Sequence, residues 1–406
     1  MRIVMLSWEY PPRIVGGMST HVLELSHALV NLGIEVHVIT MGTPEALEYE
    51  IDLGGVHVHR VTINNNNNFL KEIRSLNYLT EKRFGYLYEK WKNDGKSTLV
   101  HAHDWLSYEA AHHIQIKYNM PFLATIHATE KGRNNGIFTK LQRHIHDQEY
   151  RLALEATRVI VCSEFMRSEV TQNFHCPVEK VDVIFNGVNT SKLVLNWDEN
   201  EIIQLREEFA KKHEKIVTFV GRFVHEKGVH LLLDAATIVV AKMPNTKFIL
   251  VGSARDHFKK FVRWYNMTDN IIFTGFKSND EVFKLYKISN VAAFPSLYEP
   301  FGIVALEAMA VGVPVVSGDT GGFREVVLHN ETGTLSYAGD AQSLAWAILK
   351  VLEEPDRAAV LSKNAINRLS LDFHWPTLAQ KTINVYHNTL DQIHQLRDQQ
   401  ESILGA

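Results

Sequence analysis

Two basic side chains stand five residues apart in a loop that could hold a phosphate group. Arg222 and Lys227 lie within Gly221-Arg-Phe-Val-His-Glu-Lys-Gly228. A guanidinium forms a forked pair with phosphate oxygens, and an ammonium acts as a point charge. Together they predict a site that stabilises a departing nucleoside diphosphate. A solvated surface pair is the competing interpretation, and for two basic residues alone it would usually hold.

Two glutamates farther along the chain could bind the polar parts of a nucleotide-sugar. Glu299 and Glu307 are eight residues apart, one before a predicted helix and one inside it. A carboxylate can accept two hydrogen bonds from a ribose diol. The backbone amides of Phe301, Gly302 and Ile303 could hold sugar hydroxyls at the start of that helix. The alternative is two surface glutamates, one of them favoured by the helix dipole.

Several familiar nucleotide and metal motifs are missing from the sequence. It contains no Gly-x-Gly-x-x-Gly after a strand, no Gly-x4-Gly-Lys-Ser/Thr and no Asp-x-Asp. A bound diphosphate must therefore be neutralised by arginine, lysine and backbone amides. The pairs His101-Ala-His103 and His144-Ile-His146 lack further ligands at metal-site spacing, so no metal site and no cofactor are predicted.

The elements that position these residues repeat a strand–helix pattern. A strand at 3–6 is followed by a helix at 21–32, Gly33 and a strand at 34–40. This succession is typical of a parallel sheet. Further strands are predicted at 56–61, 99–102, 122–126, 159–162 and 181–184, and then, after a polar stretch, at 216–220, 248–251, 271–274, 291–294, 314–317 and 333–335.

The restart of the pattern after the polar stretch predicts two doubly wound α/β domains. We expect one domain over 1–195, a second over 196–375 and a terminal helix over 376–406. Ligands of open α/β sheets bind beyond the carboxyl ends of the strands, so the site is expected in a cleft where the two sets of strand ends face each other. Gly16 and Gly17 follow the first strand and would let a ligand approach the backbone closely.

The segment from Glu299 to Glu307 resembles the Glu-x7-Glu motif of retaining glycosyltransferases of family 4, which have the GT-B fold. The likeness covers nearly the whole chain and includes Gly16-Gly17 and the Gly-Arg-x4-Lys diphosphate clamp. It implies two Rossmann-like domains facing across a cleft and a C-terminal helix that crosses back to the first domain. It also implies that Glu307 binds the ribose, that Glu299 lies near the transferred sugar, and that Thr320-Gly321-Gly322 lies near the donor.

Two further segments resemble the glycogen-synthase-like branch of that family, which builds α-1,4-glucans. They are His101-Ala-His103-Asp104-Trp105 and Thr125-Ile-His127-Ala-Thr-Glu130. The resemblance implies that His127 contacts the donor sugar near the reacting carbon and that His103 and Asp104 face the acceptor. It further implies retention without a covalent intermediate, with the leaving phosphate as the base. The expected donor is ADP-glucose or UDP-glucose, and the expected acceptor is a glucan or oligosaccharide.

Bulk composition limits the alternatives. The net charge of −4 argues against a nucleic-acid partner. Only two cysteines are present, no apolar run approaches a membrane span, and the N-terminus is predicted to be a core strand, so we expect a cytoplasmic enzyme. Two alternatives remain: transfer to a lipid or cell-surface precursor, for which the basic, aromatic segment 257–265 could mark a membrane-facing helix, and a non-catalytic sugar-binding protein. For that segment, a helix with its apolar side on its own domain is the favoured interpretation.

Overall fold

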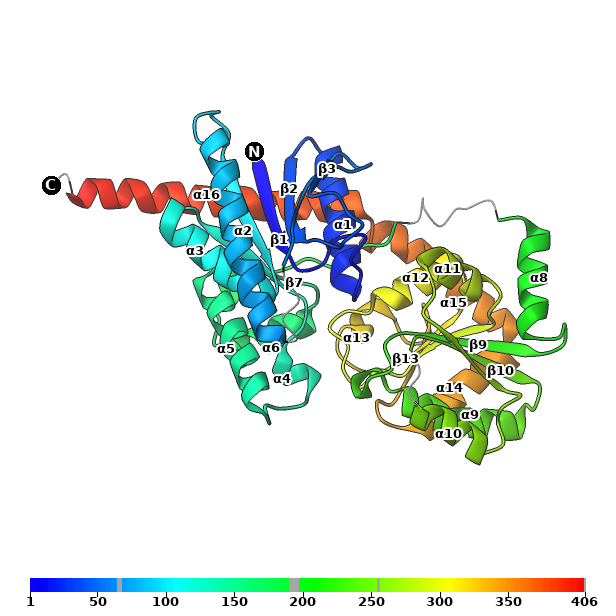
Figure 1. Cartoon of the computed structure of the whole chain (residues 1–406). Coiled ribbons are helices and arrows are strands. Elements are labelled where there is room, and N and C mark those ends of the chain that lie inside the picture. The colour runs from blue at the N-terminus through cyan, green and yellow to red at the C-terminus, as the bar shows by residue number, and fades with distance from the viewer. Residues whose placement is uncertain (64–67, 190–196, 254–255, 405–406) are drawn as a thin grey trace. The chain divides into compact units, whose positions relative to one another are not determined.

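The chain forms two compact units, seen here in a computed structural model that describes residues 1–63, 68–189, 197–253 and 256–404 (Figure 1). The first unit comprises Met1–Asn186 and Trp375–Ala406, and the second comprises Gly187–His374. Most of the asparagine run at 64–68 and part of the polar stretch after residue 186 lie outside the described residues.

An eight-stranded sheet forms the centre of the first unit. All neighbouring strands are parallel except β3, which runs antiparallel to β4 at the edge. The order is β3-β4-β2-β1-β5-β6-β7-β8, so the winding direction reverses between β1 and β5. The strands are β1 (Arg2–Ser7), β2 (Glu35–Met41), β3 (Tyr49–Ile51), β4 (His57–Val61), β5 (Thr98–His103), β6 (Phe122–Ile126), β7 (Val159–Val161) and β8 (Val181–Val183).

The first unit's helices begin and end at residues suited to those positions. Gly33 takes a φ of +82° just beyond the first helix, a conformation that glycine adopts without steric cost. The side chain of Asn68 accepts a hydrogen bond from the Lys71 amide and caps the second helix. The helices are α1 (Gly17–Asn31), α2 (Phe69–Trp91), η1 (Trp105–Ser107), α3 (Tyr108–Tyr118), α4 (Glu130–Arg133), α5 (Lys140–Glu155), α6 (Glu164–Phe174), η2 (Val178–Lys180) and α16 (Trp375–Leu404).

Helix α16 completes the core of the first unit. It packs against α1, and its buried residues join the same apolar cluster as those of β1, β2 and α1. The hydroxyl of Tyr386 also lies 2.8 Å from Nδ1 of the buried His101 on β5. The predicted return of the C-terminal helix to the first domain is therefore confirmed. The cluster includes Trp375, Leu378, Ala379, Ile383 and Tyr386.

A six-stranded parallel sheet forms the centre of the second unit. Its order is β11-β10-β9-β12-β13-β14, which places the reversal of winding between β9 and β12. Alternation with helices explains why these strands are almost continuously apolar, since both faces of such a sheet are covered. The strands are β9 (Lys215–Val220), β10 (Thr246–Val251), β11 (Ile271–Gly275), β12 (Val291–Phe294), β13 (Val315–Gly318) and β14 (Thr334–Ser336).

Helices cover both faces of the second sheet. In Figure 1, α9, α10 and α14 lie on one side and α11, α12 and α15 on the other. The doubly wound α/β architecture predicted for both halves is thus confirmed. The elements are α8 (Glu199–Phe209), η3 (His225–Lys227), α9 (Val229–Lys242), α10 (Asp256–Trp264), α11 (Asn279–Lys287), α12 (Ile303–Val311), α13 (Phe323–Val326), α14 (Ala341–Glu353) and α15 (Pro355–Asp372).

Candidate active site

The loop between β9 and α9 carries the predicted phosphate-binding residues to the point where the second sheet changes its winding direction. It turns at Gly228, whose φ is +66° and whose position leaves no room for a side chain. A Cβ there would lie 1.9 Å from the carbonyl oxygen of Pro295. The carbonyl of Glu226 accepts a 2.8 Å hydrogen bond from the amide of Leu297. These contacts fasten the β9–α9 loop to the loop that follows β12.

Lys227 and Glu299 meet where these two loops join. The ammonium of Lys227 lies 2.6 Å from Oε2 of Glu299, and the hydroxyl of Ser296 donates to the same oxygen at 3.0 Å. Both charged side chains are largely shielded from solvent, with 22% and 9% of their surfaces exposed. Such shielding strengthens the attraction compared with an exposed surface pair. The structure therefore brings together two residues that the sequence assigned to one site from different segments.

Glu307 lies inside α12, eight residues after Glu299, and differs from it in having no partner. Among the described residues, no side chain or amide forms a hydrogen bond or ion pair with its carboxylate. Burial raises the pKa of Glu307 to about 7, and Glu307 in turn helps to raise the pKa of the neighbouring Tyr286. A partly buried carboxylate without donors is unusual in a folded protein, and a ligand hydroxyl pair would satisfy it.

The start of α12 offers amides to a ligand. Gly302 precedes the helix with a φ of +110°, and no side chain caps the first turn, which begins at Ile303. A Cβ on Gly302 would lie 2.4 Å from the ring of Phe323. Glycine is therefore required here by both conformation and space. Phe301, immediately before it, is buried and anchors the turn.

The loop Thr320-Gly321-Gly322 packs directly against the Glu299 segment. The amide of Gly322 donates to the carbonyl of Glu299 at 2.8 Å, and the Thr320 hydroxyl donates to the carbonyl of Leu297 at 3.1 Å. A Cβ on Gly322 would meet the backbone of Phe301 at 2.5 Å. The predicted donor-side residues from 299 to 322 thus form one connected group in the second unit.

Arg222 is the least constrained of the predicted residues. Slightly more than half of its side chain is exposed, and its guanidinium lies 3.5 Å from Oε1 of Glu226. It is not bonded to Lys227 or Glu299 within the described residues. This exposed guanidinium, in the same loop as Lys227, is available to a phosphate, and its present contact is a weak surface pair.

In the first unit, the glycine loop after β1 is organised by a carboxylate that the sequence analysis did not assign. Oε2 of Glu9 accepts hydrogen bonds from the amides of Val15 and Gly16, both at 2.8 Å. Burial raises the pKa of Glu9, and these two amides oppose that shift. Gly16 is the N-cap of α1, and Gly17 is its first residue. No side chain caps the start of this helix.

His103, Asp104 and His127 come together at the carboxyl ends of β5 and β6, next to the point where the first sheet changes its winding direction. Nδ1 of His103 lies 3.2 Å from Nε2 of His127. The amide of His127 donates to Oδ1 of Asp104 at 2.7 Å. Burial raises the pKa of Asp104 to about 6, an effect that this hydrogen bond partly offsets, and burial lowers the pKa of His127 to about 4.

His21 joins this group although the sequence analysis overlooked it. Its ring lies 4.7 Å from that of His127 in an edge-to-face arrangement, and its Nδ1 lies 2.6 Å from Oδ1 of Asn186. Burial lowers the pKa of His21 to about 3, with His127 adding to the shift. The sequence did contain an indication that His21 is buried: it lies four residues before Leu25, on the apolar side of the predicted helix.

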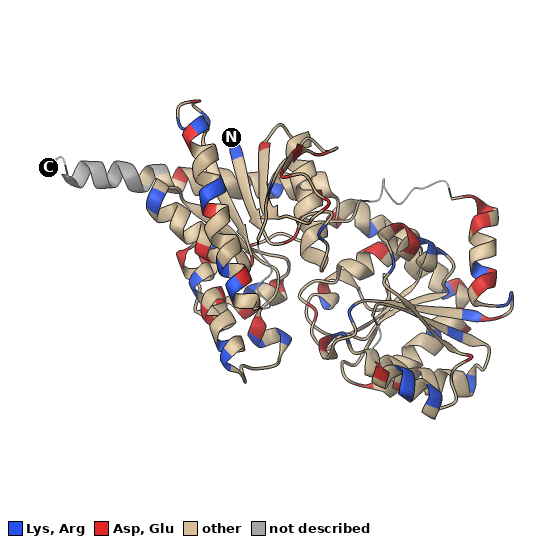
Figure 2. Ribbon diagram, viewed as in Figure 1, with Lys and Arg blue, Asp and Glu red and all other residues tan. Residues whose placement is uncertain are grey.

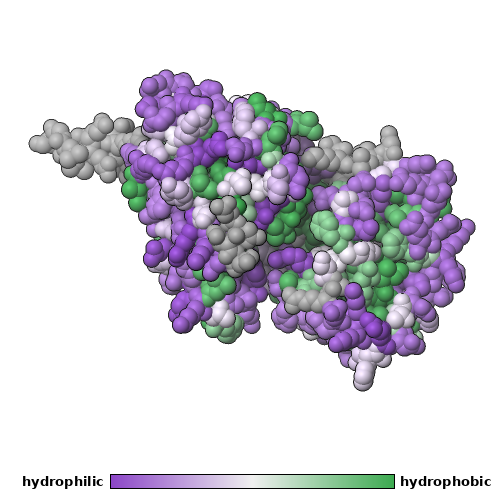
Figure 3. All heavy atoms as spheres, viewed as in Figure 1, coloured by the Kyte–Doolittle hydropathy of each residue, from purple (hydrophilic) through white to green (hydrophobic). Residues whose placement is uncertain are grey.

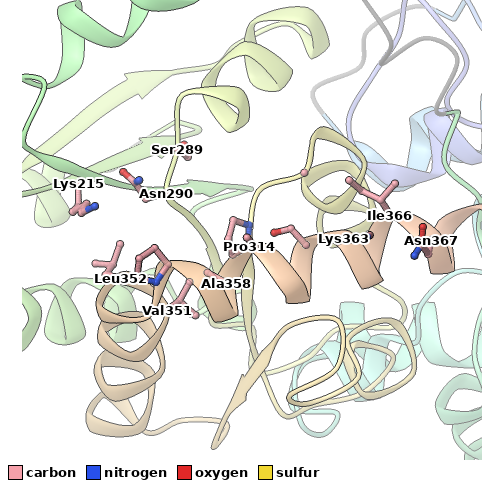
Figure 4. A pocket seen from close by; sticks show the side chains of 14 residues that line it. Lys215, Ser289, Asn290, Pro314, Val351, Leu352, Ala358, Lys363, Ile366 and Asn367 are labelled. Carbon is pink, nitrogen blue, oxygen red and sulfur yellow. The ribbon is translucent and has the colours of Figure 1, made fainter.

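One pocket of about 500 Å³ lies apart from all of these residues (Figure 4). It is found at the opposite end of the second sheet, where Lys215 begins β9 and Asn290 and Pro314 precede β12 and β13. Lys363 and Ile366 of α15 also line it. Because ligands of such sheets bind at the carboxyl ends of the strands, this pocket is not the site predicted from the sequence.

The surface of α10 matches the favoured interpretation of segment 257–265. Phe258 and Val262 are buried in the core of the second unit. Figure 2 shows basic residues on this helix and both signs of charge interspersed on the two units, while hydrophilic side chains predominate on the face drawn in Figure 3. In the part of the chain that the structure describes, no helix combines the length and apolar character needed to cross a membrane.

Comparisons with known proteins match both halves of the chain. Residues 15–192 match the family Glycosyltransferase Family 4, and residues 201–368 match the family Glycosyl transferases group 1. An uncharacterised glycosyltransferase from Methanocaldococcus jannaschii is 35% identical over 97% of this chain and 100% of its own length. A glycogen synthase from Mycobacterium tuberculosis is 33% identical over 95% of this chain and 94% of its own.

A solved structure shows the same architecture. Sucrose-phosphate synthase from Thermosynechococcus elongatus superposes with a TM-score of 0.80 at 25% identity, over 96% of this chain and 99% of its own.

Proposed function

Because this chain belongs to the glycosyltransferases of family 4 and has their GT-B fold, we propose that it moves glucose from a nucleoside-diphosphate glucose to an α-glucan-type acceptor with retention of configuration. The observation that carries the donor half of this proposal is in the second unit. The Lys227–Glu299 pair is formed there, and Glu307, eight residues after Glu299, has a carboxylate without a donor among the described residues.

Each donor-side residue has a role that its surroundings support. Glu307 accepts hydrogen bonds from the ribose diol. Lys227 and Arg222 oppose the negative charge that develops on the leaving diphosphate, an electrostatic effect that is often the largest in catalysis. The amides of the turn at Gly302 and the loop at Thr320 hold sugar and phosphate oxygens. No Asp-x-Asp pair is present to hold a divalent ion on the phosphates, so we propose that donor binding is metal-independent.

The proposed chemistry does not require a covalent intermediate. The bond between the anomeric carbon and the diphosphate oxygen breaks, the acceptor oxygen bonds to the anomeric carbon on the same face, and the released phosphate takes the proton of that hydroxyl. Glu299 and His127 position the sugar ring and stabilise its positive charge without bonding to it. Glu299 already has a cationic partner in Lys227 at 2.6 Å, which holds the carboxylate in one orientation.

The acceptor assignment depends on similarity and on the first unit. The Mycobacterium tuberculosis relative is a glycogen synthase, and it aligns over nearly the full length. We assign the acceptor side to His103 and Asp104, which lie beside His127. A lipid or cell-surface acceptor, and a protein that binds sugar without transferring it, are the alternatives that the experiment must separate.

The first test is a screen of donors and acceptors with the purified protein. ADP-glucose, UDP-glucose and GDP-mannose are each offered with and without glycogen or maltooligosaccharides, in the presence of EDTA, and release of nucleoside diphosphate is followed. We expect glucan-dependent release from one glucose donor, with an α-configured product by proton NMR. Release only with lipid extracts would support the first alternative, and donor binding without release in any pair would support the second.

A further inference from the structure

Three histidines from three separate elements converge in the first unit. His21 lies on α1, His103 ends β5 and His127 follows β6. One ring nitrogen from each lies within 4.8 Å of the other two. His21 and His103 are 6% and 0% exposed, while His127 is partly exposed. The group was invisible to spacing rules because its members are 82 and 24 residues apart in the chain.

The hydrogen bond from His21 to Asn186 fixes which nitrogen of His21 is free. The side-chain oxygen of Asn186 can only accept, so Nδ1 of His21 must carry the proton. In the neutral ring, Nε2 then has no proton and carries a lone pair that can bind an ion. That atom is buried and has no hydrogen-bond partner within the described residues. A metal-ligating histidine usually donates its other ring N–H to a carbonyl or carboxylate oxygen in this way.

His103 also has a nitrogen without a partner. Its Nδ1 faces Nε2 of His127 at 3.2 Å, and its own Nε2 is buried with no partner among the residues that the structure describes. Two zinc ligands at bond lengths of about 2.0–2.1 Å in a tetrahedron are separated by about 3.3 Å. The observed separation therefore fits two imidazoles on one ion as well as it fits a hydrogen bond.

His101 provides an internal contrast. It is equally buried and stacks on His103, with ring centroids 4.2 Å apart. Both of its nitrogens are satisfied, one by the hydroxyl of Thr125 at 2.7 Å and the other by that of Tyr386 at 2.8 Å. Burial alone therefore does not leave a histidine nitrogen without a partner, whereas His21 and His103 each keep one such nitrogen within the described residues.

We propose that His21, His103 and His127 form a binding site for a divalent transition-metal ion, with Zn²⁺ as the preferred ion. Three neutral imidazoles with an open fourth position are a zinc ligand set known from enzymes. Ligation requires a neutral imidazole with a free nitrogen, and His21 provides one because its Nδ1 faces Asn186 while its Nε2 has no partner within the described residues. The partly exposed His127 provides the entry path.

Nearby carboxylates offset the charge of a bound ion. Oδ1 of Asp104 accepts a hydrogen bond from the backbone N–H of His127, and Glu9 lies close enough to Asp104 for the charge of Asp104 to help raise the pKa of Glu9. The site therefore combines neutral ligands with the nearby negative charge of Asp104 and Glu9.

Occupation by a metal has a consequence for the proposed reaction. A zinc ion on His127 holds the ring that we assign to positioning the donor sugar. Metal binding and glucose transfer are then mutually exclusive, and the ion acts as a reversible inhibitor. This consequence depends on the proposed function, whereas the binding itself does not.

Binding is tested with Co²⁺ as a spectroscopic probe and Zn²⁺ as its competitor, on the full-length metal-free protein. We expect one tight equivalent of Co²⁺, visible as the intense visible bands of a four-coordinate ion and displaced by Zn²⁺. His21→Gln should weaken binding of this equivalent by about 100-fold or more, because even the loss of a group that only orients a ligand costs about 10–100-fold. Circular dichroism verifies that each variant is folded.

His146→Gln is the matched control. His146 also has a buried ring nitrogen without a partner, but it belongs to no group of three ligands within the described residues. This variant should bind Co²⁺ like the parent protein. Equal loss of the tight equivalent in both variants, or its persistence in His21→Gln, would overturn the proposal, as would a parent protein that shows only weak, octahedral Co²⁺.

A second pair of variants leaves all three ligands in place. Asn186→Ala removes the oxygen that orients His21 and should weaken Co²⁺ binding by about 10–100-fold, while Asn186→Asp should restore it. Identical affinities in these two variants would contradict the proposed orientation and with it the site. Tight Zn²⁺ binding without inhibition of transfer would uphold the metal site and contradict the assignment of His127 to the donor sugar.

Discussion

The carboxylate of Glu307 is held where burial raises its pKa to about 7 and where no donor is present among the described residues. The folded state therefore keeps a proton between about pH 4.5 and 7 that the unfolded chain has released. Since the unfolded state binds fewer protons in this window, stability falls as the pH rises through it. Glu307 thus lowers the stability of the ligand-free protein at neutral and alkaline pH.

Replacing Glu307 by glutamine should distinguish the stability that Glu307 costs the ligand-free protein from its role in donor binding. At pH 8, Glu307→Gln should raise the free energy of unfolding by up to about 3 kcal/mol, while at pH 4 the two proteins should unfold alike. Urea titrations at both pH values measure this. The same variant should bind the donor about 10–100-fold more weakly, because hydrogen bonds to a charged acceptor are lost. A variant that is less stable at pH 8 would contradict the argument.

Lys227 is expected to act in the transition state more than in binding. Lys227→Ala should lower kcat by about 100- to 1,000-fold, the usual effect of removing one charge-stabilising group, while circular dichroism stays unchanged. Lys227→Ala also leaves Glu299 without its partner, so the double variant Lys227→Ala/Glu299→Gln is the control for that side effect. Near-normal turnover in Lys227→Ala would contradict the donor-site assignment.

Single residues show what the sequence could and could not predict. Lys227, Glu299 and Glu307 were identifiable because they follow strands at fixed spacing, and the structure places the first two in direct contact. Asn186 could not be identified, because its contact with His21 joins segments 165 residues apart, and Glu9 could not be identified because no pattern shows that its carboxylate turns back onto the amides of Val15 and Gly16. The side chain of an isolated polar residue gives no indication of its partner until the topology places the two together.

Turns at the ends of strands are the elements that hold the donor site. Gly228 and Gly275 both have a positive φ, of +66° and +76°, so alanine should incur a similar backbone cost of about 1–2 kcal/mol at each. They differ in space, since a Cβ on Gly228 would overlap the carbonyl of Pro295 and a Cβ on Gly275 would meet nothing within 4 Å.

This pair therefore gives a matched test of the turn. Gly228→Ala should lose about 1–3 kcal/mol more stability than Gly275→Ala, because the neighbouring backbone must move. It should also abolish most transfer, since Lys227 is the adjacent residue, whereas Gly275→Ala should remain active. Thermal unfolding and the glucan assay measure both effects. Equal losses in the two variants would show that the close approach to Pro295 is unimportant.

The strands themselves were predictable because they are short, apolar and regularly separated by helices. Every strand expected from the sequence is present within two residues of its predicted bounds. One observed strand was not expected from the sequence. It is β3, an exposed antiparallel edge strand of three residues. Tyr49 and Ile51 have no buried face to create a pattern, so only the pairing of this segment with β4 defines it.

For the molecule as a whole, helix α16 makes the first unit depend on the end of the chain. Ending the chain after His374 would remove several core residues, including Leu378 and Tyr386, and leave His101 without one of its partners. Hydrogen exchange should then accelerate in β1 and β5 while β9 and β12 of the second unit keep their protection. Uniform acceleration in both units, or none in either, would contradict a division in which α16 belongs to the first unit alone.

The order of the two units along the chain also determines when each can fold during synthesis. A ribosome delivers the strands of the first unit before those of the second, yet α16, which covers part of the first unit's core, is made only after the whole second unit. The second unit, continuous between Gly187 and His374, has all of its strands and can close while the earlier one still exposes apolar surface. The part of the protein made first is therefore the last to mature, and chaperones should engage nascent chains chiefly through their amino-terminal half.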